Sequence, residues 1–456
     1  MDEILYDALK RLGLSIMRMV KDCISRNAIK PEEMAFYRLR VNKFQYTDQG
    51  NIEWSASPEF FTKPSWFRAS IELTESIKKS DEYSLALEQI IKIFGKDAIH
   101  PQALEWFVMK LINEILQTQK FEETNIDGFV KTFIKDLYGE PVRCWAEAEL
   151  DGIILLLDKV EVSYGIKIRK TKAEDLEREI PAYYFMQQTI VPSPSAILNI
   201  EFLGRGADEI LGKVQQTISI LRLFKVGSVK LLRCSIRSDS ITSFGFGIPL
   251  GPSIFGGPEP VLEKYLITEE DVPNLKKFWQ GIENAIPISF FELGITKIDH
   301  LTIAYNRYND ALFQDGNLER RIANAVMGLE ALFLKSGELQ ELVYRLNLRM
   351  SKILSLLGYD PYEVRKIIKD AYKVRSIFAH GGHLSYNERK KLESKYKSIQ
   401  NFVRQLLDYL RISIIVMILS KREKDDFIDL IDDSFVDKKR EEMLNSIISL
   451  LKNIIG

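Results

Sequence analysis

An arginine and a histidine stand five residues apart late in the sequence, in the segment Arg375-Ser-Ile-Phe-Ala-His380, and two glycines follow them. A guanidinium is permanently charged and can hold a phosphate, whereas an imidazole can take up and release a proton near neutral pH. These two properties are sufficient in principle to cut RNA without a metal ion. The chain has four histidines, the others being His100, His300 and His383, so few residues compete for the role of general acid or base.

The residues before this motif predict the helix that positions it. Asp360 is a typical N-cap, Pro361 suits the first helical position, and Glu363 suits the first turn. Apolar residues then recur at steps of three and four, which predicts a helix over 361–380 with one buried face. They are Val364, Ile367, Ile368, Ala371, Val374 and Phe378. Arg375 falls within this face, so it must be paired or line an interface. The alternative to a functional role is a core ion pair without chemistry.

His380 would point well away from Arg375 if both stood on one continuous helix. The two glycines after it indicate that the helix ends at about His380, which frees its side chain from the helical register. A second copy of the helix across a symmetric dimer can also bring an arginine and a histidine together. The alternative is a histidine that caps the helix and does no chemistry.

Helical periodicity continues on both sides of the motif. We expect helices over about 298–314, 318–335, 338–357, 361–380, 386–420 and 437–454. Ser385 and Glu388 form a capping box, so the loop after the motif is short. His383 lies in this loop, either as an auxiliary acid or base or as an ordinary exposed histidine. Four nearby lysines form either a local basic surface or a solvated helix face. They are Lys390, Lys391, Lys395 and Lys397.

From Asn317 to about Leu410 the chain resembles the HEPN superfamily, and within it the Apea-like branch. The segments that show the resemblance are "RRIANAVMGLEALFLKSGELQELVYRLNLRMSKILSLLG" and "DPYEVRKIIKDAYKVRSIFAHGG". HEPN domains are helical bundles that usually dimerise, and many are metal-independent ribonucleases of defence or toxin systems. Their signature is an arginine, four to six residues and a histidine, which corresponds here to Arg375 and His380. Asn or Asp often follows the arginine, where this chain has Ser376.

The resemblance implies an endoribonuclease in which the 2′-hydroxyl of RNA attacks the adjacent phosphate. RNA would be the substrate, the chain would form a homodimer, and an antitoxin or sensor could be a further partner. No cofactor or metal is expected. Glu330 and Arg349 are polar positions typical of the branch, and a structural Glu–Arg pair inside the bundle is the role we expect for both. The alternative function is a non-catalytic module for dimerisation and RNA or nucleotide binding, which Ser376 and the net charge favour.

Composition describes an ordinary soluble globular protein. The 456 residues include 63 basic and 64 acidic ones, so no overall basic field would attract nucleic acid and any RNA must be drawn by a local cleft. Cys23, Cys144 and Cys234 match neither a disulfide framework nor a zinc site. We expect no signal peptide and no membrane span, hence a cytoplasmic protein. The apolar run 412–419 is expected to be a buried helix segment, with a place at a dimer interface as one alternative, and the acidic run 424–435 is expected to be a solvated segment.

The expected fold class is α+β in three regions. Residues 1–140 should be mainly helical, with a first helix near the start, four more over about 65–79, 83–94, 101–119 and 126–138, and a hairpin within 36–54. Residues 141–295 should mix strands and helices, with two or three strands in 143–170, a helix over 207–224 and a Gly/Pro-rich surface loop over 244–260. Residues 296–456 should form the HEPN-like helical domain. Aromatic residues of the first region should be core rather than a ligand pocket. They are Trp54, Phe60, Phe61, Trp66 and Trp106.

Overall fold

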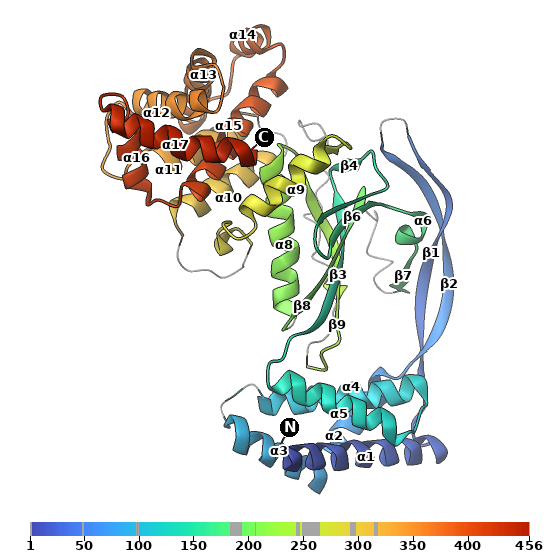
Figure 1. Ribbon diagram of the computed structural model, residues 1–456. Coiled ribbons are helices and arrows are strands. Elements are labelled where there is room, and N and C mark those ends of the chain that lie inside the picture. The colour runs from blue at the N-terminus through green and yellow to red at the C-terminus, as the bar shows by residue number, and fades with distance from the viewer. Residues whose placement is uncertain are drawn as a thin grey trace.

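The predicted α+β class is confirmed. The computed structural model describes residues 2–47, 50–96, 98, 100–182, 194–205, 207–242, 247–248, 265–291, 298–313 and 318–455. A layer of N-terminal helices lies at one end of the molecule, a C-terminal helical bundle lies at the other, and the strands lie between them (Figure 1). The Gly/Pro-rich loop expected over 244–260 falls outside the described residues, apart from the two-residue strand β10 (Gly247–Ile248).

The N-terminal layer consists of amphipathic helices with a hydrophobic core of their own. These helices are α1 (Glu3–Ser25), α2 (Phe67–Ile77), α3 (Asp81–Phe94), α4 (His100–Thr118) and α5 (Glu123–Leu137). Asp2 caps α1 by accepting hydrogen bonds from the backbone amides of Ile4 and Leu5, and the helix buries Leu5, Leu9, Leu12 and Ile16.

The predicted hairpin is a long antiparallel ribbon, β1 (Glu32–Tyr46) and β2 (Ile52–Ser65), and β7 (Arg178–Pro181) pairs with its first strand. The ribbon runs alongside the sheet of the middle region (Figure 1). The expectation of an aromatic core is wrong for Phe60, which is 58% exposed on the ribbon. Trp54 and Phe61 are half-buried on the same ribbon. Strand alternation places side chains on both faces of a two-stranded ribbon, and the described residues do not cover both faces completely.

The middle region is built on an antiparallel sheet in the order β10-β9-β3-β8-β6-β5. The strands are β3 (Val142–Asp151), β5 (Lys159–Ser163), β6 (Ile166–Lys170), β8 (Ala196–Gly204) and β9 (Lys230–Ser238). Segment 143–170 therefore contributes four strands, not two or three. The additional strand is the short β4 (Ile153–Leu155), which lies outside this sheet and pairs in parallel with β11 (Tyr265–Ile267). Alternate residues of β3 are buried and share a core with α8 (Ala207–Phe224), whose bounds match the prediction.

The C-terminal region is helical, as predicted, but one of the expected helices is divided into two. Its helices are α10 (His300–Phe313), α11 (Leu318–Phe333), α12 (Leu342–Leu356), α13 (Pro361–Ala379), α14 (Tyr386–Tyr396), α15 (Ile399–Ser420), α16 (Lys424–Asp433) and α17 (Lys438–Ile455). The predicted helix 386–420 breaks at Lys397, which has a φ of 68°, and Ser398 caps the next helix. The acidic run is not simply solvated: it forms α16, whose apolar residues, Phe427 and Ile431 among them, are buried.

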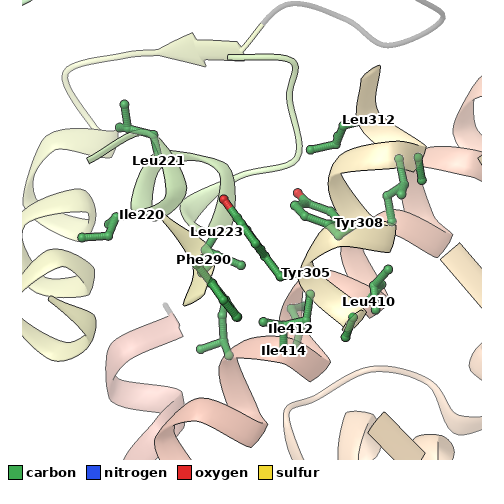
Figure 2. Close-up of a cluster of buried hydrophobic side chains, with 14 of the residues drawn as sticks. Ile220, Leu221, Leu223, Phe290, Tyr305, Tyr308, Leu312, Leu410, Ile412 and Ile414 are labelled. Carbon is green, nitrogen blue, oxygen red and sulfur yellow. The ribbon is translucent and has the colours of Figure 1, made fainter. Parts of the chain in front are cut away.

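One hydrophobic core joins the middle and C-terminal regions, so the core does not divide near residue 296. Between these regions lies α9 (Asp271–Ile282), and a short 3-10 helix, η1 (Ile288–Phe290), ends in Phe290, which stacks on Tyr305 with ring centroids 4.1 Å apart. Figure 2 shows these side chains among apolar residues of α8, α10 and α15. The apolar run of α15 is buried here by the chain's own elements: Ile412, Ile414 and Ile415 are at most 1% exposed. That burial leaves them unavailable for the expected dimer contact.

Candidate functional site

The motif helix α13 begins as its sequence predicts. Asp360 accepts hydrogen bonds from the backbone amides of Tyr362, at 2.7 Å, and Glu363, at 3.4 Å, and Pro361 occupies the first helical position. The predicted apolar face is buried at Val364, Ile367, Ile368, Ala371 and Val374, whereas Phe378 is half-buried. This face packs against α11 and α12, so the position of the motif depends on the core of the bundle.

The helix ends at His380, as predicted, and the glycines explain how. Gly381 has a φ of +77°, a left-handed conformation that strains any residue with a Cβ. Its amide donates to the carbonyl of Phe378, and the amide of Gly382 donates to the carbonyl of Ile377, both at 2.9 Å. This pair of bonds is a Schellman motif. His380 is thereby left as an exposed C-cap at the end of the helix.

Arg375 is half-buried and paired with a carboxylate. Its Nη2 lies 3.4 Å from Oε2 of Glu330 on α11, and the two side chains are 32% and 17% exposed. The ring of Tyr372, one turn earlier on α13, lies 5.5 Å from the guanidinium carbon. Burial raises the pKa of the Tyr372 phenol, and the negative charge of Glu330 adds to the rise. A carboxylate partner is expected for a partly buried arginine on this face, but Glu330 pairs here with Arg375 and not with Arg349, the arginine expected from the sequence.

The two motif residues lie apart within one chain. Among the described contacts of these residues, Arg375 reaches back to α11, whereas His380 is exposed beyond the last turn of α13. A single chain therefore presents an arginine and a histidine separately, at the same end of one helix. The symmetric dimer expected from the sequence is one arrangement that would bring an arginine of one copy and a histidine of the other to one phosphate.

Arg349 belongs to a different network, deep in the bundle. It is 2% exposed, donates to both carboxylate oxygens of Glu338 at 2.6 and 2.8 Å, and donates to the carbonyl of Phe333 at 2.7 Å. Asp432 of α16 accepts two further bonds, at 2.6 and 2.8 Å. The Arg349 guanidinium lowers the pKa of Glu338 to about 2. Arg349 thus forms a structural pair, as expected, but with these carboxylates and not with Glu330.

Ser376 and His383 have no described side-chain partner at the motif. The Ser376 carbonyl accepts the His380 amide at 3.2 Å, which is ordinary helix-end bonding. His383 is exposed in the loop after α13, and the next residue, Leu384, anchors that loop by donating its amide to Glu319 at 3.0 Å. His383 therefore lies in the loop that follows the motif, and no described contact fixes its ring.

The lysines on and after the motif helix, which could form a local basic surface, are partly neutralised by nearby carboxylates. Lys373 on α13 pairs with Glu388 at 3.0 Å, and Lys395 pairs with Asp370 at 2.5 Å. Lys390 lies over the ring of Tyr386. An attraction for RNA would therefore depend on a few local cations, in keeping with the balanced net charge.

Two residues near the motif were not predicted. Tyr372 stands three positions before Arg375, a spacing that places both on one side of a helix, so this signal was present in the sequence. Glu319, which anchors the loop, lies 65 positions before the residue it binds, and helical periodicity contains no signal for such a contact.

Two features are absent from the part of the chain that the structure describes. It contains no group of three or more His, Cys, Asp or Glu side chains arranged to hold a metal ion. Among the helices it contains, none is both long and apolar enough to cross a membrane.

No protein-family model, curated protein or solved structure matches this chain. The assignment of a function therefore rests on the geometry of Arg375 and His380 and on the resemblance of residues 317–410.

Proposed function

We propose that this chain is a metal-independent endoribonuclease that acts as a homodimer, with Arg375 and His380 as its catalytic residues. One observation supports this most: the two residues stand at the same end of a well-capped helix, with His380 open to solvent and Arg375 a third exposed. A buried structural arginine, such as Arg349, is only 2% exposed. The accessible end of α13 is thus the place where a phosphate can reach both types of side chain.

The proposed reaction uses the hydroxyl group that distinguishes RNA from DNA. The 2′-hydroxyl loses its proton to a neutral His380 imidazole and attacks the adjacent phosphorus. The bond from phosphorus to the 5′ oxygen breaks, and the His380 imidazole, now protonated, gives its proton to that oxygen. Arg375 stabilises the charge that develops on the phosphate. The products are a 2′,3′-cyclic phosphate and a 5′-hydroxyl.

The proposed enzyme would act in the cytoplasm as part of a defence or toxin-type stress system, with an antitoxin or sensor as a further partner. This part of the proposal follows from the HEPN resemblance alone. A copurified protein that blocks access to His380 would support it.

The test is cleavage of mixed RNA by the purified full chain in excess EDTA. We expect the parent to cut RNA, and we expect Arg375→Lys and His380→Ala to lose most of the activity while remaining folded. Lysine keeps the charge of Arg375 but loses the planar fork that contacts two phosphate oxygens. Arg365→Lys is the matched control, because Arg365 is exposed on the same helix. Activity that disappears in EDTA and returns with magnesium would assign the chemistry to carboxylates instead.

The second candidate is a non-catalytic module that dimerises and binds RNA or a nucleotide. The pairing of Arg375 with Glu330, together with the paired lysines nearby, favours it, because a carboxylate competes with phosphate for the guanidinium. RNA binding by the parent without any cleavage, unchanged in His380→Ala, would replace the first proposal with this one.

A further inference from the structure

A hollow of about 440 Å³ lies on the six-stranded sheet of the middle region, on the face opposite α8. Helix α8 packs against β3, β8 and β9 on the other face, where alternate residues of β3 are buried in the shared core (Figure 1). The hollow is lined mainly by outward-facing residues of β3, β6, β8 and β9, and none of them belongs to the Arg375–His380 motif. Its volume is in the range of ligand-binding sites.

A tryptophan and an arginine lie side by side at the centre of the hollow. Backbone pairing places Trp145 of β3 opposite Arg237 of β9 and, on its other side, opposite Glu201 of β8. Directly opposed residues of an antiparallel pair point to the same face, with Cβ atoms about 4.5–5.5 Å apart. The register therefore makes an aromatic ring and a guanidinium neighbours on the outward face of the sheet.

The same face is covered at one end by β7 and is open at Trp145. Four residues after Trp145 on β3, Glu149 is buried, and Arg178 of β7 pairs with it at 2.6 Å. Arg237 and Glu201, in contrast, are exposed, and Trp145 is half-buried. A ligand can therefore reach Trp145 and Arg237 from solvent, while the buried ion pair limits the hollow on the side of β7.

The charges around the hollow are nearly balanced, with three cations and two carboxylates among the lining residues. Two of the cations already face carboxylates: Arg143 lies 3.7 Å from Glu201, and Lys167 lies 3.8 Å from Glu161. The third is Arg237, and among the residues that the structure describes none pairs with its guanidinium. Attraction for a phosphate therefore comes from this one exposed arginine and not from an excess of positive charge.

The second lining carboxylate, Glu147, is held by other residues of the sheet. Arg169 lies 3.5 Å from it, and the side-chain amide of Asn199 donates a hydrogen bond to it at 3.3 Å. The amide oxygen of Asn199 remains an acceptor that can bind the edge of a base. Glu147 is thus partly neutralised and opposes an anion at Arg237 less than a lone carboxylate would.

Trp145 provides a surface for stacking. Its side chain is half-buried, and among the described residues no aromatic ring or cation lies against the indole. Bases of nucleic acids stack on such rings largely regardless of sequence, because every base has a π face. Antiparallel sheets that carry helices on one face can bind single-stranded RNA on the other face in this way. An indole beside an unpaired arginine therefore matches a base together with its phosphate.

We propose that this hollow binds single-stranded nucleic acid, with a base stacked on Trp145 and an adjoining phosphate at Arg237. The motif helix α13 lies in the C-terminal bundle, apart from this sheet, so the hollow is a second contact with a strand and not the site of cleavage (Figure 1). Stacking and a phosphate contact do not require a 2′-hydroxyl, so DNA should bind here as well as RNA. Binding at the sheet is therefore independent of the ribonuclease activity proposed above.

Fluorescence anisotropy of a labelled single-stranded DNA of about twelve thymidines, titrated with the full chain, tests the proposal without cleavage. We expect saturable binding by the parent, and binding at least roughly tenfold weaker by Trp145→Ala and by Arg237→Glu. Trp145→Phe keeps an aromatic ring and should keep most of the affinity. His380→Ala should bind like the parent.

Two matched controls change the same kinds of residue elsewhere. Phe67→Ala removes an aromatic ring that is 70% exposed on α2, and Arg26→Glu reverses an exposed charge at the end of α1. Both should bind the oligonucleotide like the parent. Thermal unfolding of each variant separates loss of binding from loss of fold, and Arg237→Glu keeps the test valid if Trp145→Ala does not fold, since Arg237 is exposed.

Three outcomes would overturn the proposal. They are the absence of binding to the oligonucleotide, parental affinity in both Trp145→Ala and Arg237→Glu, and equally tight binding of double-stranded DNA of the same length. The last result would show a plain anion surface, because paired bases cannot stack on Trp145. A chain that cuts RNA in EDTA but does not bind the oligonucleotide would refute this proposal alone, whereas one that binds it at the sheet but cuts no RNA would refute only the ribonuclease.

Discussion

Arg375 and Glu330 form the direct ion pair between the motif helix α13 and helix α11, with Nη2 and Oε2 3.4 Å apart. The distance is long for a charge-assisted hydrogen bond, and the arginine side chain is a third exposed. The pair therefore holds the guanidinium in place only weakly, so that an anion such as a phosphate could displace Glu330 from it. Glu330 therefore positions the Arg375 guanidinium in the structure.

We predict that Glu330→Gln strengthens RNA binding. The substitution removes the negative charge that competes with phosphate for Arg375, while the amide oxygen can still accept a hydrogen bond. The affinity for single-stranded RNA, measured by fluorescence anisotropy at low salt, should rise severalfold. Glu363→Gln is the matched control, since it removes the same charge from an exposed position at the other end of α13. Unchanged or weaker binding by Glu330→Gln would exclude Arg375 as a phosphate ligand.

We predict that Arg349→Ala destabilises the fold far more than Arg375→Ala does. Removing the buried Arg349 leaves Glu338 and Asp432 without their partner, a change that typically costs about 3–5 kcal/mol. The more exposed Arg375 pair should cost less than about 1 kcal/mol. Urea unfolding followed by circular dichroism measures both. Similar losses for the two variants would contradict the assignment of Arg349 to structure and Arg375 to function.

The Glu338–Arg349 pair also predicts a pH dependence. The folded pKa of Glu338 is about 2, below its ordinary value of 4.5. A lowered folded pKa stabilises the protein above pH 4.5, and this contribution is lost as the pH falls from 4.5 toward 2. The free energy of unfolding of the parent should therefore fall more steeply in this window than that of Glu338→Gln. Parallel curves for the two proteins would show that Glu338 makes no such contribution.

Most of the helices and the limits of the motif could be predicted from local signals. Asp360, Pro361 and the two glycines mark the ends of α13 through hydrogen bonds within a few residues, and the apolar period marks its buried face. The break at Lys397 was missed because neither glycine nor proline occurs there, and a positive φ at a lysine leaves no compositional sign.

Contacts between distant residues were predicted only in part. The need of the partly buried Arg375 for a partner could be predicted, but its identity could not, because the sequence suggested Arg349 as the partner of Glu330. The bonds from Arg349 to Glu338 and Asp432 could not be predicted either, since they depend on how α12 and α16 pack.

We predict that Gly381→Ala destabilises the motif end, whereas Gly337→Ala does not. Alanine at the positive φ of Gly381 should cost about 1–2 kcal/mol. Gly337 has open space around its Cα and no such backbone conformation, which makes it the matched control. Thermal unfolding of the two variants measures the difference. Equal melting temperatures would mean that the Schellman motif does not hold His380 in place.

In the proposed dimer, Arg375 of one copy and His380 of the other form one ribonuclease site, and mixing two inactive variants is the decisive test of this composite site. Arg375→Lys and His380→Ala, each inactive alone, are unfolded together, refolded as a mixture and assayed on RNA in EDTA. About a quarter of the parental rate should return, since half of the random dimers are mixed and each mixed dimer has one intact site. No recovery from a mixture shown to be dimeric, or full activity of either variant alone, would contradict the claim.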